Sequence, residues 1–138
     1  MALKVVAAAR QHLFSSTVNL YLSLVNDTTG APIVGQTPTV AIRRASDGFF
    51  FNGTVFIDTS GVPTNLSMVE VGAIAIAGLY RYSFTDPGPI VPTPPTPQLT
   101  KDTYELRYVN TGAPPTGGTM HDVIGVARQL RDINTQGS

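Results

Sequence analysis

Hydrophobic and polar residues alternate along much of this chain with a period of two, which is typical of strands that bury one face. Residues 18–25 (VNLYLSLV) alternate most regularly, and the turn-forming residues 26–32 (NDTTGAP) end them. Residues 39–44 (TVAIRR) repeat the pattern before the turn signature Ser-Asp-Gly. The residues of these two segments that we expect to face the core are Val18, Leu20, Leu22, Leu24, Val40 and Ile42.

Two later segments, residues 78–84 (GLYRYSF) and 103–109 (TYELRYV), place aromatic residues, or in one case a leucine, at every second position. Their aromatic faces are expected to be buried, because aromatic residues favour strands and cover large apolar areas. The expected inward residues are Tyr80, Tyr82, Phe84, Tyr104, Leu106 and Tyr108. Residues 66–71 predict a short strand that either continues through 73–77 or ends in a loop, and residues 123–127 form a last apolar run.

Residues 49–57 (FFFNGTVFI) contain the strongest hairpin signal, because Asn-Gly suits a two-residue type I′ turn between two β-favouring runs. Three successive phenylalanines cannot all face one core, since neighbouring side chains on a strand point to opposite faces. At least one should point outward. Either a second layer, such as the N-terminal segment, covers it, or it contacts another molecule, which makes Phe50 and Phe51 candidate partner-binding residues.

Residues 85–103 contain six of the eleven prolines and lie between two predicted strands. Proline fixes φ and donates no backbone hydrogen bond, so this stretch should be an extended, polyproline-like arm. The arm is either a solvated loop or a segment laid on a neighbouring subunit. We favour docking, because extended proline-rich chains lose less entropy on binding. The candidate contacts in the arm are Ile90, Val91, Pro94, Pro95 and Leu99.

The N-terminal residues 1–16 are ambiguous. Apolar positions approximate helical spacing and alanine favours a helix, but an extended arm or an added strand fits equally. Val5 and Val6 are the candidate partner contacts here. Lys4 and Arg10 interrupt the apolar run and leave it too short for the apolar core of a signal peptide. We therefore expect a soluble, unprocessed chain.

About seven short strands separated by turn clusters predict an all-β fold, an antiparallel β-sandwich of the immunoglobulin-like type. A jelly roll is the alternative. The length fits one domain. We expect a sandwich over residues 17–130 that carries the proline-rich arm, preceded by the N-terminal arm or short helix (1–16) and followed by a tail (131–138).

Charged residues make up only 13% of the chain, and the nine basic residues balance the nine acidic ones. The pair Arg43-Arg44 is expected at a solvent-facing strand edge, and no basic run indicates a nucleic-acid partner. Little charge repulsion keeps copies apart, so we expect a homo-oligomer or a multicopy assembly. The chain has no cysteine, and no apolar segment reaches the length of a membrane span.

Candidate chemistry is sparse. His121 and Asp122 could be offered as a base and its orienting acid, but adjacent strand residues point to opposite faces. Turn formation alone accounts for Asp27, Asp47, Asp58 and Asp86, although such a group could hold a cation at a loop cluster. No nucleophile, phosphate or metal motif accompanies them. The sequence therefore predicts a non-enzymatic protein with no catalytic residue, cofactor or metal.

Several segments resemble small immunoglobulin-like modules of tailed-bacteriophage virions. Residues 37–53 (TPTVAIRRASDGFFFNG) carry a strand with an Arg-Arg and Ser-Asp-Gly turn, and residues 66–71 (LSMVEV) follow. Residues 78–84 supply a Gly-Leu-Tyr strand, and residues 103–110 (TYELRYVN) supply a strand that ends in an Arg-Tyr pair. The resemblance spans about residues 18–110 and departs from the pattern in the N-terminal segment and the proline-rich arm.

This resemblance implies a structural role in a virion, made in the host cytoplasm, with the major capsid protein or other virion subunits as partners. A capsid decoration (cement) protein that binds between major capsid subunits is expected first, with a head location favoured over the tail or neck. The alternative is a neck, tail or fibre component, such as a host-surface adhesin or a carbohydrate-binding module. No catalytic residue carries over from the resemblance.

Overall fold

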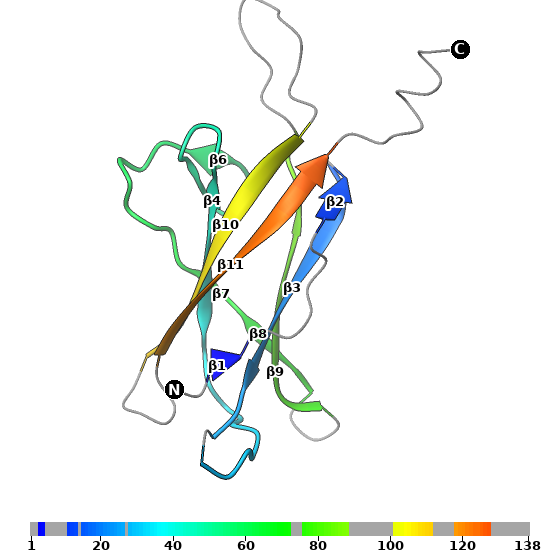
Figure 1. Ribbon diagram of the computed structural model, residues 1–138, viewed down its shortest axis with the longest axis vertical. Helices are drawn as coiled ribbons and strands as arrows, with labels where there is room; N and C mark the ends of the chain where they lie inside the picture. Colours follow the sequence, from blue (N-terminus) through cyan, green and yellow to red (C-terminus); the bar gives the residue numbers. More distant parts are fainter. Residues whose placement is uncertain are drawn as a thin grey trace, which may run out of the picture.

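The structure is a computed structural model that describes residues 3–4, 11–13, 15–26, 28–72, 76–88, 101–111 and 118–127. These residues form strands in two sheets and no helix, so the predicted all-β class is confirmed (Figure 1). Within the same ranges, no helix is long and apolar enough to cross a membrane.

The first sheet has four strands in the order β1-β3-β9-β8, and every neighbouring pair is antiparallel. Its strands are β1 (Leu3–Lys4), β3 (Thr17–Leu24), β8 (Val69–Gly72) and β9 (Ile76–Thr85). The central pair, β3 and β9, keeps one register from Thr17↔Thr85 to Ser23↔Leu79. This sheet therefore has β1 and β8 as its edges.

The second sheet follows the order β2-β11-β10-β4-β5-β6, and β7 also pairs with β4. Its strands are β2 (Gln11–Leu13), β4 (Thr39–Arg44), β5 (Phe50–Phe51), β6 (Phe56–Ile57), β7 (Leu66–Ser67), β10 (Lys101–Asn110) and β11 (Gly118–Ala127). Because β2 runs parallel to β11, this sheet is mixed, and the expectation of a purely antiparallel fold is wrong at this edge.

Residues 3–4 and 11–13 of the N-terminal segment are strands, so the helical alternative is wrong for them. Strand β1 pairs with β3 in the first sheet, whereas β2 pairs with β11 in the second. Each sheet edge offers unpaired backbone N–H and C=O groups, and a strand satisfies these groups where a helix would not. Val5 and Val6 lie outside the described residues.

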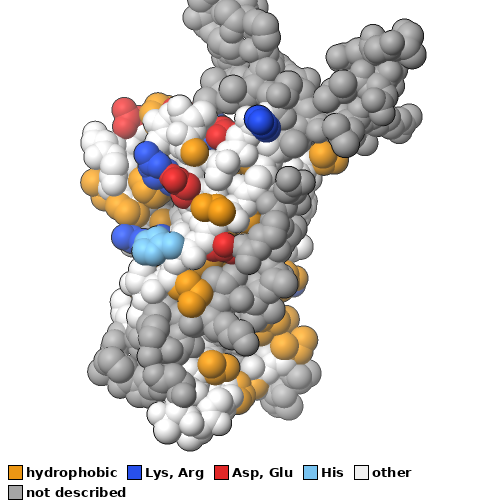
Figure 2. Space-filling view, in the orientation of Figure 1, with side chains coloured by type: hydrophobic (Ala, Val, Ile, Leu, Met, Phe, Trp, Pro, Cys, Tyr) orange, Lys and Arg blue, Asp and Glu red, His pale blue; other side chains and the backbone are white. Residues whose placement is uncertain are grey.

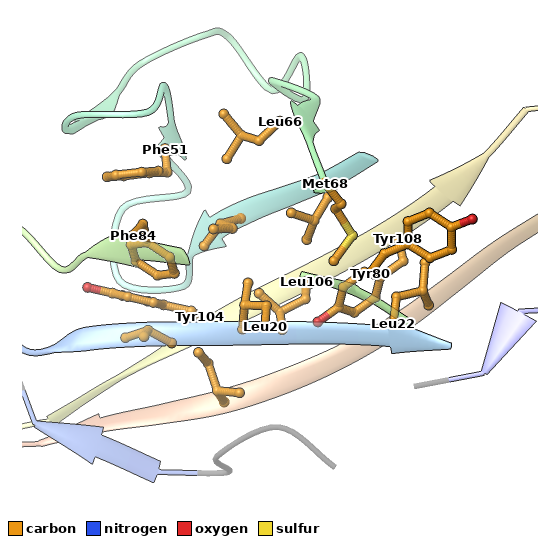
Figure 3. Packing of buried hydrophobic residues seen from close by; sticks show 14 of the residues in the cluster. Leu20, Leu22, Phe51, Leu66, Met68, Tyr80, Phe84, Tyr104, Leu106 and Tyr108 are labelled. Atoms are coloured by element: carbon orange, nitrogen blue, oxygen red, sulfur yellow. The ribbon is translucent and has the colours of Figure 1, made fainter. Parts of the chain in front are cut away.

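The core lies between the two sheets, where alternate residues of β3, β9, β4 and β10 meet (Figure 3). Tyr82 is only partly buried and packs against the core. All the other residues predicted to face inward are at most 6% exposed. Burial of this kind contributes roughly 1.5–3 kcal/mol for a large apolar side chain. The alternation read from the sequence therefore identifies the layer that holds the fold together.

The predicted hairpin is confirmed, but its turn is not the expected one. Phe51 pairs with Phe56, so four residues form the loop instead of Asn52-Gly53 alone. The Asn52 side chain closes this loop by accepting hydrogen bonds from the backbone N–H groups of Thr54 and Val55, both at 2.9 Å. This register places the Phe51 and Phe56 rings side by side in the core, with their centroids 5.3 Å apart, whereas a two-residue turn at Asn52-Gly53 would set Phe51 against Thr54.

The predicted strand over residues 66–71 is divided between the two sheets. Strand β7 pairs with β4, and β8 pairs with β9. Met68 stands between them, is 3% exposed, and donates its backbone N–H to the Pro38 carbonyl at 2.9 Å. This short stretch therefore connects the sheets directly.

Candidate functional site

Two of the predicted partner-binding residues are buried. Phe51 is 1% exposed and faces the core, and Phe50 is 7% exposed on the opposite side of β5. Phe50 is outward by alternation, as expected, but it is not an exposed tip, because it forms part of a hollow that Pro63 also lines. Of the two alternatives left open for an outward phenylalanine, Phe50 therefore fits a side chain covered within the protein, and its predicted contact with a partner stays a prediction.

The other predicted contacts are not tested by the structure. They lie outside the described residues and remain predictions: Val5, Val6, Ile90, Val91, Pro94, Pro95 and Leu99. The arm that contains five of them joins the end of β9 to the start of β10.

The hollow lies on the outward face of β4, β10 and β11 and has a volume of about 350 Å³. Strand register builds it in two rows across the sheet. In the first row, Glu105 stands between Arg43 and Val123. In the second row, Arg107 stands between Ala41 and His121. Figure 2 shows basic, acidic, histidine and hydrophobic side chains gathered on this face.

The hollow is apolar inside. Ala41 projects outward between the inward residues of β4, yet it is only 1% exposed, and Phe50 and Pro63 lie beside it. Val123 lines the same hollow and is 55% exposed. A concave apolar surface with a few polar groups around it is the usual form of a binding site.

The charges around the hollow are unevenly paired. Arg43 forms an ion pair with Glu105, and both side chains are almost half exposed. Arg107 donates a hydrogen bond from Nη2 to the neutral Asn65 amide oxygen at 3.1 Å, while its buried Nε makes no hydrogen bond. Among the described residues, Arg107 has no carboxylate partner, so its positive charge is not neutralised at this face.

The expectation that Arg43 and Arg44 both face solvent is wrong for Arg44. Its side chain is only 11% exposed, pairs with Asp47 at 2.7 Å and stacks over the Phe56 ring. Burial by itself raises the pKa of Asp47, but hydrogen bonds and the positive charge of Arg44 outweigh it, so the pKa lies below its usual value. Alternation along β4 separates the two arginines, and only Arg43 lines the hollow.

A second polar cluster lies inside the protein and was not found from the sequence. The Asp86 carboxylate is 1% exposed and accepts a hydrogen bond from the Tyr104 hydroxyl, which lies 2.9 and 3.0 Å from its two oxygens. It also contacts Nε2 of His12 at 3.1 Å and accepts the backbone N–H of Gly88 at 2.7 Å. Turn formation, the role predicted for Asp86, explains only the last of these bonds.

This cluster joins three segments that are distant in the sequence. His12 lies in β2, Asp86 follows β9, and Tyr104 lies in β10, so the carboxylate links the N-terminal strand to both sheets. It stands where the proline-rich arm leaves the first sheet. Because the carboxylate is buried and already contacts these partners within the protein, we interpret the cluster as a structural one that holds the three segments together.

The buried tyrosine predicts alkaline instability. Burial, together with the charge and hydrogen bond of Asp86, raises the pKa of Tyr104, and burial also raises the pKa of Tyr80 and Tyr82. Their contribution to stability is present below pH 10, where the unfolded chain keeps its tyrosines protonated, and is lost as the pH rises above that value. The free energy of unfolding, measured with denaturant at increasing pH, should fall from about pH 10 upward.

Tyrosinate absorbance gives the check on this prediction. In the native protein, the tyrosinate signal of Tyr104 should appear only together with unfolding. Tyr104→Phe should make the fall in stability less steep. A Tyr104 signal that titrates near its ordinary pKa while the fold stays intact would contradict the prediction.

No family model matches this chain, and no curated protein or solved structure is significantly similar to it. Within the described ranges, no three histidine, aspartate or glutamate side chains are grouped so that they could hold a metal ion.

Proposed function

We propose that this chain is a non-enzymatic structural module of a tailed-phage virion, with capsid decoration between major capsid subunits as its first role. The observation that carries the binding role is the outward hollow, whose apolar interior and charged surroundings match the apolar centre and polar rim of protein contacts. The virion assignment rests on the resemblance of residues 18–110 to virion modules.

We also propose that the two sheets form an immunoglobulin-like sandwich of the variable type. That fold has one sheet of strands A, B, E and D and a second of G, F, C, C′ and C″. In their order across each sheet, β1, β3, β9 and β8 correspond to the first set, and β11, β10, β4, β5 and β6 to the second. This correspondence supports the immunoglobulin-like alternative over a jelly roll.

Binding would consist of many modest contacts, which repetition over a particle multiplies. Exposed apolar side chains fit this mode: Val69 on the edge strand β8 is 69% exposed, and Val123 stands at the hollow. The predicted contacts in the proline-rich arm would add a second area of attachment.

The proposal predicts where the protein is found in purified particles. Quantitative mass spectrometry of separated heads and tails should find it with the heads, in a copy number comparable to that of the major capsid protein. A few copies in the tail or neck fraction would replace decoration with the neck, tail or fibre role. Its absence from both fractions would refute a virion role.

The contribution of the arm can be tested in the same particles. Exchanging residues 90–99 for a glycine-serine segment of equal length should abolish incorporation. The matched control is Val34→Ser, which removes an exposed apolar side chain elsewhere (46% exposed) and should be incorporated normally. Far-UV circular dichroism of both variants would verify that the strands are retained.

A further inference from the structure

The electrostatic character of the hollow follows from the pairing of its charges. The Arg43 charge is neutralised by Glu105, and among the described residues the Arg107 guanidinium has only the Asn65 amide as a partner. Register places His121 directly opposite Arg107 on β11, so the next strand adds a second hydrogen-bonding group beside the guanidinium. This part of the hollow is suited to an anion.

The remaining carboxylate near the hollow does not cancel this charge. Asp122, the neighbour of His121, is also among the residues that line the hollow, but alternation along β11 directs its side chain away from the side of His121 and Val123. Asp122 also takes part in another interaction within the protein. Among the described residues, the Arg107 guanidinium therefore keeps a positive charge with no carboxylate paired to it.

The size and lining of the hollow limit what can fill it. A volume of about 350 Å³ admits a few side chains and not a folded domain. Phe50 and Pro63 offer apolar contact, and Val123 stands exposed beside them. An occupant should therefore combine an acidic group with a neighbouring apolar group.

We propose that the hollow binds an acidic side chain, aspartate or glutamate, carried with an apolar neighbour on an extended segment of a partner protein. The carboxylate accepts hydrogen bonds from Arg107 and His121, and the apolar neighbour packs on Phe50 and Val123. A carboxylate paired with arginine is among the stronger hydrogen-bonded contacts in proteins. This inference rests on the proposed function and names the chemistry by which the partner subunit is recognised.

A peptide segment fits this site better than a nucleic acid does. A phosphate chain would pass the Glu105 carboxylate beside Arg107, and the chain has no net positive charge to attract it. A basic segment would meet the uncompensated Arg107. Charge complementarity thus selects an acidic segment.

The test is an NMR titration of the isolated, isotope-labelled full chain with two blocked tripeptides, acetyl-Leu-Asp-Leu-amide and acetyl-Leu-Asn-Leu-amide. The acidic peptide should shift the resonances of the Arg107 Nε–H and the His121 ring with a saturating, millimolar dissociation constant. The asparagine peptide has the same shape without the charge and should bind about tenfold more weakly or not at all. Equal shifts with both peptides, or none at these two residues, would overturn the inference.

Variants separate recognition from stability. Arg107→Gln should weaken binding of the acidic peptide at least about tenfold, while Arg81→Gln, which changes an exposed arginine in β9, should leave it unchanged. If Arg107→Gln fails to fold, Val123→Asp adds a repelling carboxylate at a 55% exposed position and should abolish the same binding. Unchanged binding in Val123→Asp, or in a folded Arg107→Gln, would contradict the proposed site.

The result is independent of the particle experiment. If the protein is found with the heads but does not bind the acidic peptide, the proposed function stands and the proposed recognition site is refuted. If it binds the acidic peptide through Arg107 but is absent from particles, the recognition site stands and the virion role is refuted.

Discussion

Replacing Asp86 with alanine should lower the free energy of unfolding by about 3–5 kcal/mol. The carboxylate is enclosed, and its removal leaves the Tyr104 hydroxyl and the His12 ring without their partner in the interior. Each buried polar group left unsatisfied costs about 1–3 kcal/mol. The space vacated by the side chain adds a smaller loss of packing.

Denaturant unfolding at pH 7 measures this change, and Asp58→Ala is its matched control. Asp58 also accepts a backbone hydrogen bond in a turn, from Ser60 at 2.9 Å, but its side chain is exposed. Its loss should stay below about 1 kcal/mol. Similar losses in the two variants would show that turn formation is the whole role of Asp86.

A double variant tests whether the cluster acts as a unit. Adding Tyr104→Phe to Asp86→Ala removes the hydroxyl that the first change leaves without a partner. The second substitution should therefore destabilise much less in the Asp86→Ala background than in the natural chain. Additive losses would mean that the 2.9 Å contact contributes little.

Gly78→Ala should destabilise the protein by about 3 kcal/mol or more, because two effects combine. Gly78 has φ +79°, a left-handed conformation that costs an alanine roughly 1–2 kcal/mol. A Cβ there would also stand 2.7 Å from the Leu24 carbonyl oxygen and 2.9 Å from the Cβ of Pro32. Since the nearest obstacle is backbone, the loop that contains Pro32 or the strand itself must move.

Gly61→Ala separates these two effects. Gly61 has nearly the same conformation, φ +82°, but a Cβ there meets nothing within 4 Å. Its loss of unfolding free energy should therefore be the conformational part alone, about 1–2 kcal/mol. Denaturant unfolding of both variants gives the difference, and equal losses would show that the close approach at Gly78 relaxes freely.

The strands could be predicted from the sequence because alternation is a local property. Every second residue is apolar along β3 and from Tyr104 to Tyr108 in β10, so the buried face follows once the segment is extended. The same locality explains why the hairpin was found while its register was not. Asn-Gly favours a two-residue turn, but the contact between Phe51 and Phe56, together with their burial, decides the pairing.

The sites depend on which strands become neighbours, and that is not a local property. His12 and Asp86 are 74 residues apart, and neither has a sequence context that signals a buried pair. The hollow forms only because β4, β10 and β11 are neighbours in that order, which places Arg107 between Ala41 and His121. The one available signal was the outward alternation of Arg43 and Arg107, and it became informative only when the strands were paired.

The division of residues 66–72 between the two sheets has a mechanical consequence. Strands β7 and β8 are separated by Met68 alone, and β1 and β2 likewise contribute to opposite sheets. The backbone therefore crosses between the layers at both of these places, so a force that separates the layers must first break strand pairing or strip Met68 from the interior. We expect the two sheets to resist shear against each other and to unfold together. This property would suit a protein held between neighbouring subunits that exert forces in different directions.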